Sequence, residues 1–162
     1  MRIAILADTH MPRGSRRLPA LCLNHLREAD LIVHAGDFVT AAVLAELESI
    51  GPPVVAVYGN VDEAALQEQL PEERVVDVAG ARLGVVHDAG PARGRLDRLR
   101  RRLPGADAVI FGHSHLPLHE RAGDFQIFNP GSPTERRRAP HRSMGLATVE
   151  GARVSFAHVV LD

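Results

Sequence analysis

The sequence has one cysteine, no tryptophan and no lysine among its 162 residues. A single cysteine excludes an intrachain disulfide framework, and it argues against a structural zinc site built on several thiolates. Cys22 lies among Leu18, Leu21 and Leu26, which indicates a buried core thiol rather than a nucleophile. This cysteine usage is typical of a reducing compartment, so we expect a soluble, cytoplasmic protein.

The sequence also lacks an excess of charge and any long apolar run. Its 19 basic and 20 acidic residues give a net charge of -1, so we do not expect nucleic acid as a partner. No stretch is long enough to span a membrane, and the apolar run at the N-terminus meets Asp8 too early for a signal peptide. With 45% hydrophobic residues, the chain has the composition of one globular domain, residues 1–162.

Short apolar runs alternate with amphipathic segments in the first two thirds of the chain, and β-hairpin patterns follow. The expected strands are 2–7, 31–34, 54–58, 74–79, 81–86, 107–111, 118–122, 125–128, 143–149 and 153–160. The expected helices are 16–29, 41–49 (with Thr40 as N-cap), 93–103 and a short piece within 61–71. Strand–helix alternation favours parallel strands covered by helices. We therefore predict an α/β fold in which two mixed sheets are flanked by helices.

Side chains that ligate metals follow the predicted central strands. They are Asp8, His10, Asp37, Asn60, His87, His113 and His115. Carboxylate, amide and imidazole groups without thiolate suit Mn²⁺, Fe²⁺ or Zn²⁺. Seven ligands are too many for one tetrahedral ion but fit two ions that share a carboxylate. Two ions roughly 3.5–4 Å apart are a common device for phosphoester hydrolysis.

The sequence resembles the calcineurin-like metallophosphoesterases, most closely their small YfcE-like phosphodiesterase branch. The matching blocks, in family order, are Asp8-Thr9-His10, Gly36-Asp37, Gly59-Asn60-Val61-Asp62, His87, Gly112-His113-Ser114-His115 and Asn129-Pro130-Gly131-Ser132. The resemblance implies a four-layer α/β/β/α sandwich and hydrolysis of phosphodiester bonds by a hydroxide shared between two metal ions. Mn²⁺ is the expected metal, with Fe, Zn or Ni as alternatives, and the expected substrate is a small phosphodiester or nucleotide-like molecule.

Carried over by position, the resemblance implies two metal sites. Asp8, His10 and His115 would bind the first ion, Asn60, His87 and His113 would bind the second, and Asp37 would bridge them. Asp37, Asn60 and His113 would be the catalytic residues, with Asn60 also contacting substrate. His34 matches a neighbour of the ligands in this family rather than a ligand.

Two positions depart from the family pattern. Many relatives have histidine where this chain has Val61, and many have glycine where it has Asp88. Without that histidine we expect phosphodiesters to be hydrolysed faster than phosphomonoesters. Asp62 would orient Asn60 or a bound water, or it would cap the following segment, and this structural role is favoured.

Several alternatives stay open at this stage. Arg13 would contact substrate or simply be exposed. The arginine-rich 136–138 segment would attract phosphate or nucleotide, contact a subunit or form a solvated mobile loop, the last being favoured. A homo-oligomer is one of the open alternatives. The main rival function is an inactive scaffold of the same fold, as the retromer subunit with this fold is thought to be. A weaker rival is a phosphomonoesterase or nucleotidase.

Overall fold

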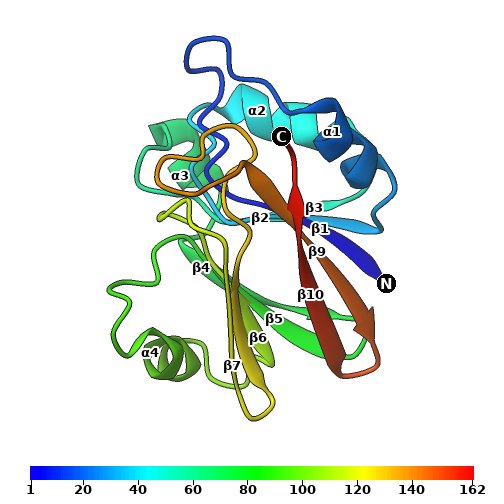
Figure 1. Ribbon diagram of the computed structural model, residues 1–162, viewed down its shortest axis with the longest axis vertical. Helices are drawn as coiled ribbons and strands as arrows, with labels where there is room; N and C mark the ends of the chain where they lie inside the picture. The colour runs from blue at the N-terminus through cyan, green and yellow to red at the C-terminus, as the bar shows by residue number, and fades with distance from the viewer.

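The computed structural model describes residues 1–162 and shows two stacked β-sheets with helices on the outside (Figure 1). The first sheet has the order β10-β9-β1-β2-β3, formed by Arg153–Val160, Ser143–Glu150, Arg2–Leu6, Leu31–His34 and Val54–Ala56. The second has the order β4-β5-β6-β8-β7, formed by Glu73–Val78, Ala81–Val86, Ala108–Ile110, Phe125–Asn129 and Leu118–Ala122. The helices are α1 (Ala20–Arg27), α2 (Ala41–Glu48), α3 (Ala64–Gln69) and α4 (Arg95–Arg102). None of these helices is long and apolar enough to cross a membrane.

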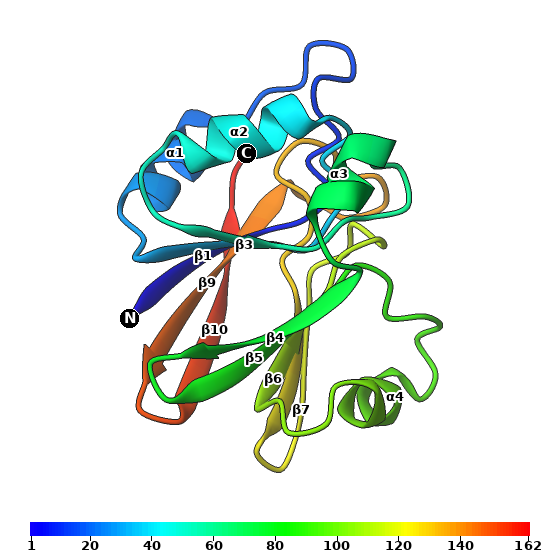
Figure 2. The ribbon, with the colours of Figure 1, turned by 180° about the vertical axis from the view of Figure 1, so that it is seen from behind.

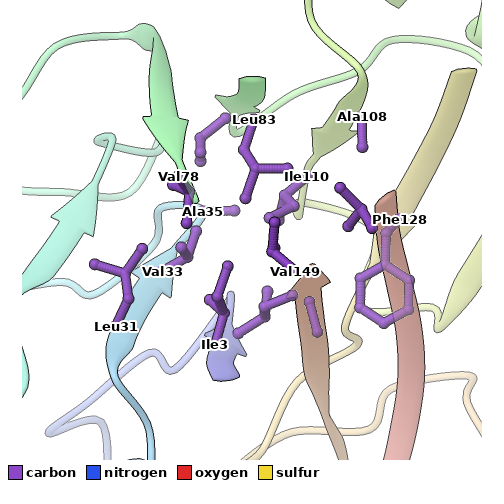
Figure 3. Close-up of a cluster of buried hydrophobic side chains, with 14 of the residues drawn as sticks. Ile3, Leu31, Val33, Ala35, Val78, Leu83, Ala108, Ile110, Phe128 and Val149 are labelled. Carbon is purple, nitrogen blue, oxygen red and sulfur yellow. The ribbon is translucent and has the colours of Figure 1, made fainter. Parts of the chain in front are cut away.

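Three hydrophobic clusters separate the four layers. On β1, Ile3 points into the cluster between the sheets, where it joins residues of the second sheet such as Leu83 and Ile110 (Figure 3). Ile5 belongs to the same cluster. The alternate residues Ala4 and Leu6 point the other way, into the cluster beneath α1 and α2. A third cluster packs α4 against the outer face of the second sheet. Alternation along central strands such as β1 thus buries both faces, whereas the edge strands β7 and β10 are largely exposed.

Parallel pairing brings the functional end of the molecule together. Strands β1, β2 and β3 are parallel to one another in the first sheet, as are β5, β6 and β8 in the second. The carboxyl ends of these strands reach the same end of the sandwich, near α3 (Figure 2). The predicted fold, two mixed sheets flanked by helices in an α/β/β/α sandwich, is confirmed.

Two local predictions differ from the structure. The helix expected over 16–29 begins at Ala20, because Pro19 adopts an extended ψ of 150° and residues before it form a loop. Thr40 does occupy the N-cap position of α2, but its hydroxyl makes no capping hydrogen bond. The N–H of Ala41, which has no acceptor within the helix, donates to Oε1 of Glu63 at 2.8 Å. A carboxylate from the loop before α3 therefore replaces the expected local cap.

Candidate metal centre

All seven predicted ligands gather where the parallel strands of the two sheets end. Asp8, Asp37 and Asn60 follow β1, β2 and β3 in the first sheet. The histidines come from the second sheet, apart from His10: His87 follows β5, and His113 and His115 follow β6. The two edges are joined directly, since the backbone N–H of His113 donates to Oδ1 of Asp8 at 3.1 Å.

The first group of ligands consists of Asp8, His10 and His115, whose ligand atoms lie within 4.8 Å of one another. Oδ1 of Asp8 is 4.0 Å from Nε2 of His10 and 3.6 Å from Nε2 of His115. All three residues are buried, and Oδ2 of Asp8 and both Nε2 atoms lack any hydrogen-bond partner. Buried polar atoms are rarely left unpaired. A convergent set of unpaired lone pairs fits a divalent cation.

The second group consists of Asn60, His87 and His113. Oδ1 of Asn60 is 3.0 Å from Nε2 of His87 and 3.0 Å from Nδ1 of His113. The two ring nitrogens are 3.3 Å apart. Nδ1 of His87 donates to the carbonyl of Ala35 at 2.8 Å, which turns the lone pair of Nε2 toward the group. Asn60 and His113 are exposed, so this group faces solvent whereas the first group is enclosed.

Asp37 lies between the two groups. Its Oδ2 is 3.3 Å from Nε2 of His10 in the first group and 3.3 Å from Nε2 of His87 in the second. Its Oδ1 accepts the backbone N–H of Val61 at 3.0 Å, which fixes the carboxylate. A carboxylate held in this way is placed to share its charge between two cations.

The backbone at the ligands is strained. Asp8, His10, Asp37, His113 and His115 have φ of 55°, 45°, 63°, 70° and 60°, in the left-handed region. Left-handed backbone costs a residue with a side chain roughly 1–2 kcal/mol. Strain of this kind clusters at active sites and ligand clamps, where the surrounding structure maintains it. Five of the seven predicted ligands thus have strained backbone, which indicates that orienting these side chains lowers the stability of the fold.

The ionisation of the centre reflects burial and mutual charge. Burial raises the pKa of Asp8 to about 7, against the opposing influence of His87 and His10. Burial also lowers the pKa of His115 to about 4, which keeps its imidazole neutral. Burial opposes the ionisation of Asp37, but the imidazoles of His10 and His87, whose Nε2 atoms both lie 3.3 Å from its Oδ2, hold its pKa well below the usual range. An ionised Asp37 carboxylate and a neutral His115 imidazole are the protonation states that metal binding needs.

The family model for the calcineurin-like phosphoesterase superfamily domain matches residues 1–152. The chain belongs to the calcineurin-like phosphoesterase superfamily. It is 36% identical over 139 residues to a probable metallophosphoesterase of Methanothermobacter thermautotrophicus, covering 85% of this chain and 80% of that protein. It is also 31% identical over 101 residues to phosphodiesterase YfcE of Escherichia coli, covering 59% of this chain and 52% of that protein. The resemblance inferred from the motifs is confirmed.

The fold of this calcineurin-like phosphoesterase also agrees with solved structures. The crystal structure of Vps29 from Entamoeba histolytica, complexed with zinc, matches with a TM-score of 0.80. That match covers 100% of both chains at 22% sequence identity, so it speaks to the fold alone.

Two buried residues support the ligands of this calcineurin-like phosphoesterase from behind. Asp62 accepts the backbone N–H groups of Gly59, Asp37 and Val39 at 2.7–3.0 Å, which ties together the loops after β2 and β3. The role of Asp62 is thus structural, but it is not the expected cap of the following segment, because Glu63 is the N-cap residue of α3 and Asp62 bonds the N–H groups of earlier residues. His34 lies outside both ligand groups: its Nδ1 accepts the N–H of Gly36, and its Nε2 is 3.2 Å from the Thr9 hydroxyl.

Other predicted residues lie farther from the ligands. The side chain of Arg13 is exposed, with no contact that ties it to the ligands. Asp88 accepts the N–H of Gly90 with its own Oδ1, so it shapes the loop after His87. Arg136 to Arg138 are exposed, as expected of a solvated loop, but Glu135 beside them contacts the centre.

The sequence pattern does not predict the contacts of Glu135, Ser132 and Thr134. The carbonyl of Glu135 accepts a hydrogen bond from Nδ1 of His115 at 3.1 Å. The hydroxyls of Ser132 and Thr134 donate to the carbonyls of Asp8 and Thr9. The match of the Asn129–Ser132 block to the family indicates that this loop matters, but it does not indicate which residues the loop contacts.

Proposed function

We propose that this protein is a phosphodiesterase that depends on two divalent metal ions, one held by each ligand group and both by Asp37. The position of Asp37 carries the proposal, because one carboxylate oxygen is equally close to a histidine of each group. Two divalent cations, when bound, supply an acidified water as nucleophile and compensate charge on the phosphoryl oxygens. Mn²⁺ is the metal we expect first, with Fe, Zn or Ni as alternatives, since the donors are oxygen and imidazole nitrogen.

The residues that face solvent would receive the substrate. Asn60 directs its Oδ1 toward His87 and His113, which leaves its Nδ2 free to donate a hydrogen bond to a phosphoryl oxygen. His113 is exposed beside it, so a phosphate would approach the centre from the side of the second group. Both residues are then candidates for a catalytic role, together with Asp37.

Val61 favours diesters over monoesters. Its side chain stands beside Asn60 and offers no proton to a leaving group, and only its backbone N–H contacts the centre, at Asp37. A substrate whose leaving group needs little protonation is therefore favoured. Comparable rates on a diester and a monoester with the same leaving group would refute this preference.

A cavity of about 430 Å³ adjoins Asn60 and His87 and would take the leaving group. The arginines in its wall are already engaged: Arg98 donates to the carbonyls of Ala89 and Pro91, and Arg102 pairs with Glu73. No cation there is free to bind a second phosphate. The cavity thus favours an uncharged leaving group of up to nucleoside size over a phosphorylated one.

The test is a hydrolysis screen of cyclic nucleotides, dinucleotides and simple diesters with Mn²⁺ supplied, together with metal analysis. We expect turnover of at least one diester, and loss of that activity in Asp37→Ala and His113→Ala. His141→Ala is the matched control, because His141 is 55% exposed, pairs with Asp162 and lies in no family motif. Two bound ions without turnover on the whole panel would refute the enzyme and favour a protein-binding scaffold.

A further inference from the structure

The segment from Asn129 to Glu135, here called the clamp, connects the ligand loops of the two sheets. Nδ2 of Asn129 donates to the carbonyl of Gly112 at 2.9 Å, just before His113. The Ser132 hydroxyl donates to the carbonyl of Asp8 at 2.7 Å, across 124 residues of sequence. The Thr134 hydroxyl donates in the same way to the carbonyl of Thr9 at 2.6 Å. The clamp therefore holds the Asp8–His10 loop through two hydroxyl-to-carbonyl hydrogen bonds.

Ser132 couples two metal ligands through a continuous chain of hydrogen bonds. Its Oγ donates to the carbonyl of Asp8 and also accepts the N–H of Glu135 at 3.0 Å. The carbonyl of the same Glu135 then accepts Nδ1 of His115 at 3.1 Å, which directs Nε2 of His115 toward Asp8. Ser132 is 1% exposed, so no water can replace its hydroxyl without a rearrangement.

The charge around Glu135 keeps this end of the clamp in place. Its carboxylate pairs with Arg16 at 2.9 Å and with Arg137 at 3.6 Å. Arg16 lies in the loop before α1, and Arg137 lies in the continuation of the clamp. Neither Ser132 nor Glu135 makes a hydrogen bond to Asn60 or His87 of the second group. The chain of contacts therefore ends on ligands of the first group, and it reaches the second group only through the N–H of His113, which donates to Oδ1 of Asp8.

We propose that Ser132 is a positioning residue that sets the affinity of the first ligand group for its metal ion. It acts by holding the backbone of Asp8 and, through Glu135, the ring of His115 in the strained conformation that points both side chains at one place. Residues that orient metal ligands typically contribute about 10- to 100-fold in metal affinity. The proposal takes its metal ions from the proposed function but needs no assumption about the substrate.

The experiment is a calorimetric titration of the metal-free, full-length protein with Mn²⁺. The binding phases are first assigned with His115→Ala, which removes the first-group ion, and with His87→Ala, which removes the second. Ser132→Ala is expected to weaken the phase that His115→Ala removes by about 10- to 100-fold. The Mn²⁺ affinity of the other phase should stay within about threefold of the wild-type value. Ser132→Thr, which keeps a hydroxyl, should bind Mn²⁺ with wild-type affinity in both phases.

Ser143→Ala is the control for the loss of a buried hydroxyl, because Ser143 is 2% exposed and its hydroxyl donates at 2.8 Å to the carbonyl of Pro130, within the clamp itself, and to no ligand loop. If Ser132→Ala does not fold, Thr134→Val removes a neighbouring clamp hydroxyl at a partly exposed position and should weaken the same phase. Unchanged affinity, equal weakening of both phases, or the same weakening in Ser143→Ala would each overturn the proposal. Two bound ions without diester hydrolysis would refute the proposed function alone.

Discussion

Asp8 is expected to destabilise the metal-free protein at neutral pH. Its carboxyl is 0% exposed, its Oδ2 has no partner, and burial raises its pKa from 3.8 to about 7. The folded protein therefore binds this proton more tightly than the unfolded chain does. The stabilisation that the buried, protonated Asp8 carboxyl gives to the folded state is complete below about pH 4 and is lost as the pH rises toward 7. A difference of about three in pKa corresponds to an upper limit of about 4 kcal/mol.

The substitution Asp8→Asn tests this cost, because the amide has the same shape and does not ionise. In urea unfolding after treatment with EDTA, the variant should be more stable than the wild type by about 2–4 kcal/mol at pH 8. At pH 5 the advantage should shrink to about 1 kcal/mol. Saturating Mn²⁺ should reverse the order, since the carboxylate then gains a cation. A metal-free variant that is no more stable than the wild type at pH 8 would show that ionised Asp8 does not destabilise the fold.

Three further substitutions follow from contacts at the loops of the second group. Val61→His should raise the rate on p-nitrophenyl phosphate relative to bis(p-nitrophenyl) phosphate, and an unchanged ratio would remove the basis for the diester preference. Gly59→Ala should abolish diester hydrolysis and lower stability by roughly 1–3 kcal/mol, because the new Cβ would lie 2.1 Å from Oδ1 of Asp37; wild-type kinetics would contradict this geometry. Asp62→Asn should cost about 1–3 kcal/mol of unfolding free energy, since an amide nitrogen replaces an acceptor of buried N–H groups. Urea unfolding measures this loss, and an unchanged unfolding free energy would mean that those N–H groups find other partners.

The convergence of the ligands could be predicted because it depends on simple rules. Strands such as β1 and β2 are recognisable as short apolar runs, and parallel strands carry the residues that follow them to one edge of the sheet. Asp8 and Asp37 therefore had to lie near each other once the alternation was recognised. The assignment of each histidine to one ion came from the resemblance to the family, and the structure adds the geometry that makes it reasonable.

The contacts that hold the ligands were beyond the reach of the sequence. Ser132 and Glu135 are common polar residues in a loop, and no periodicity links them to Asp8 or His115. The left-handed backbone at His113 could not be predicted either, because a histidine in the sequence does not indicate a positive φ as a glycine does. The start of α1 was missed for a related reason, since residues before Pro19 continue the apolar spacing of the helix without joining it.

The most direct test of the two-metal account is the rate of bis(p-nitrophenyl) phosphate hydrolysis as Mn²⁺ is added stepwise to the metal-free protein. The shared position of Asp37 predicts that activity stays low after the first equivalent, rises with the second and levels off at two ions per chain. Full activity at one equivalent, or no activity with two ions bound, would contradict the account.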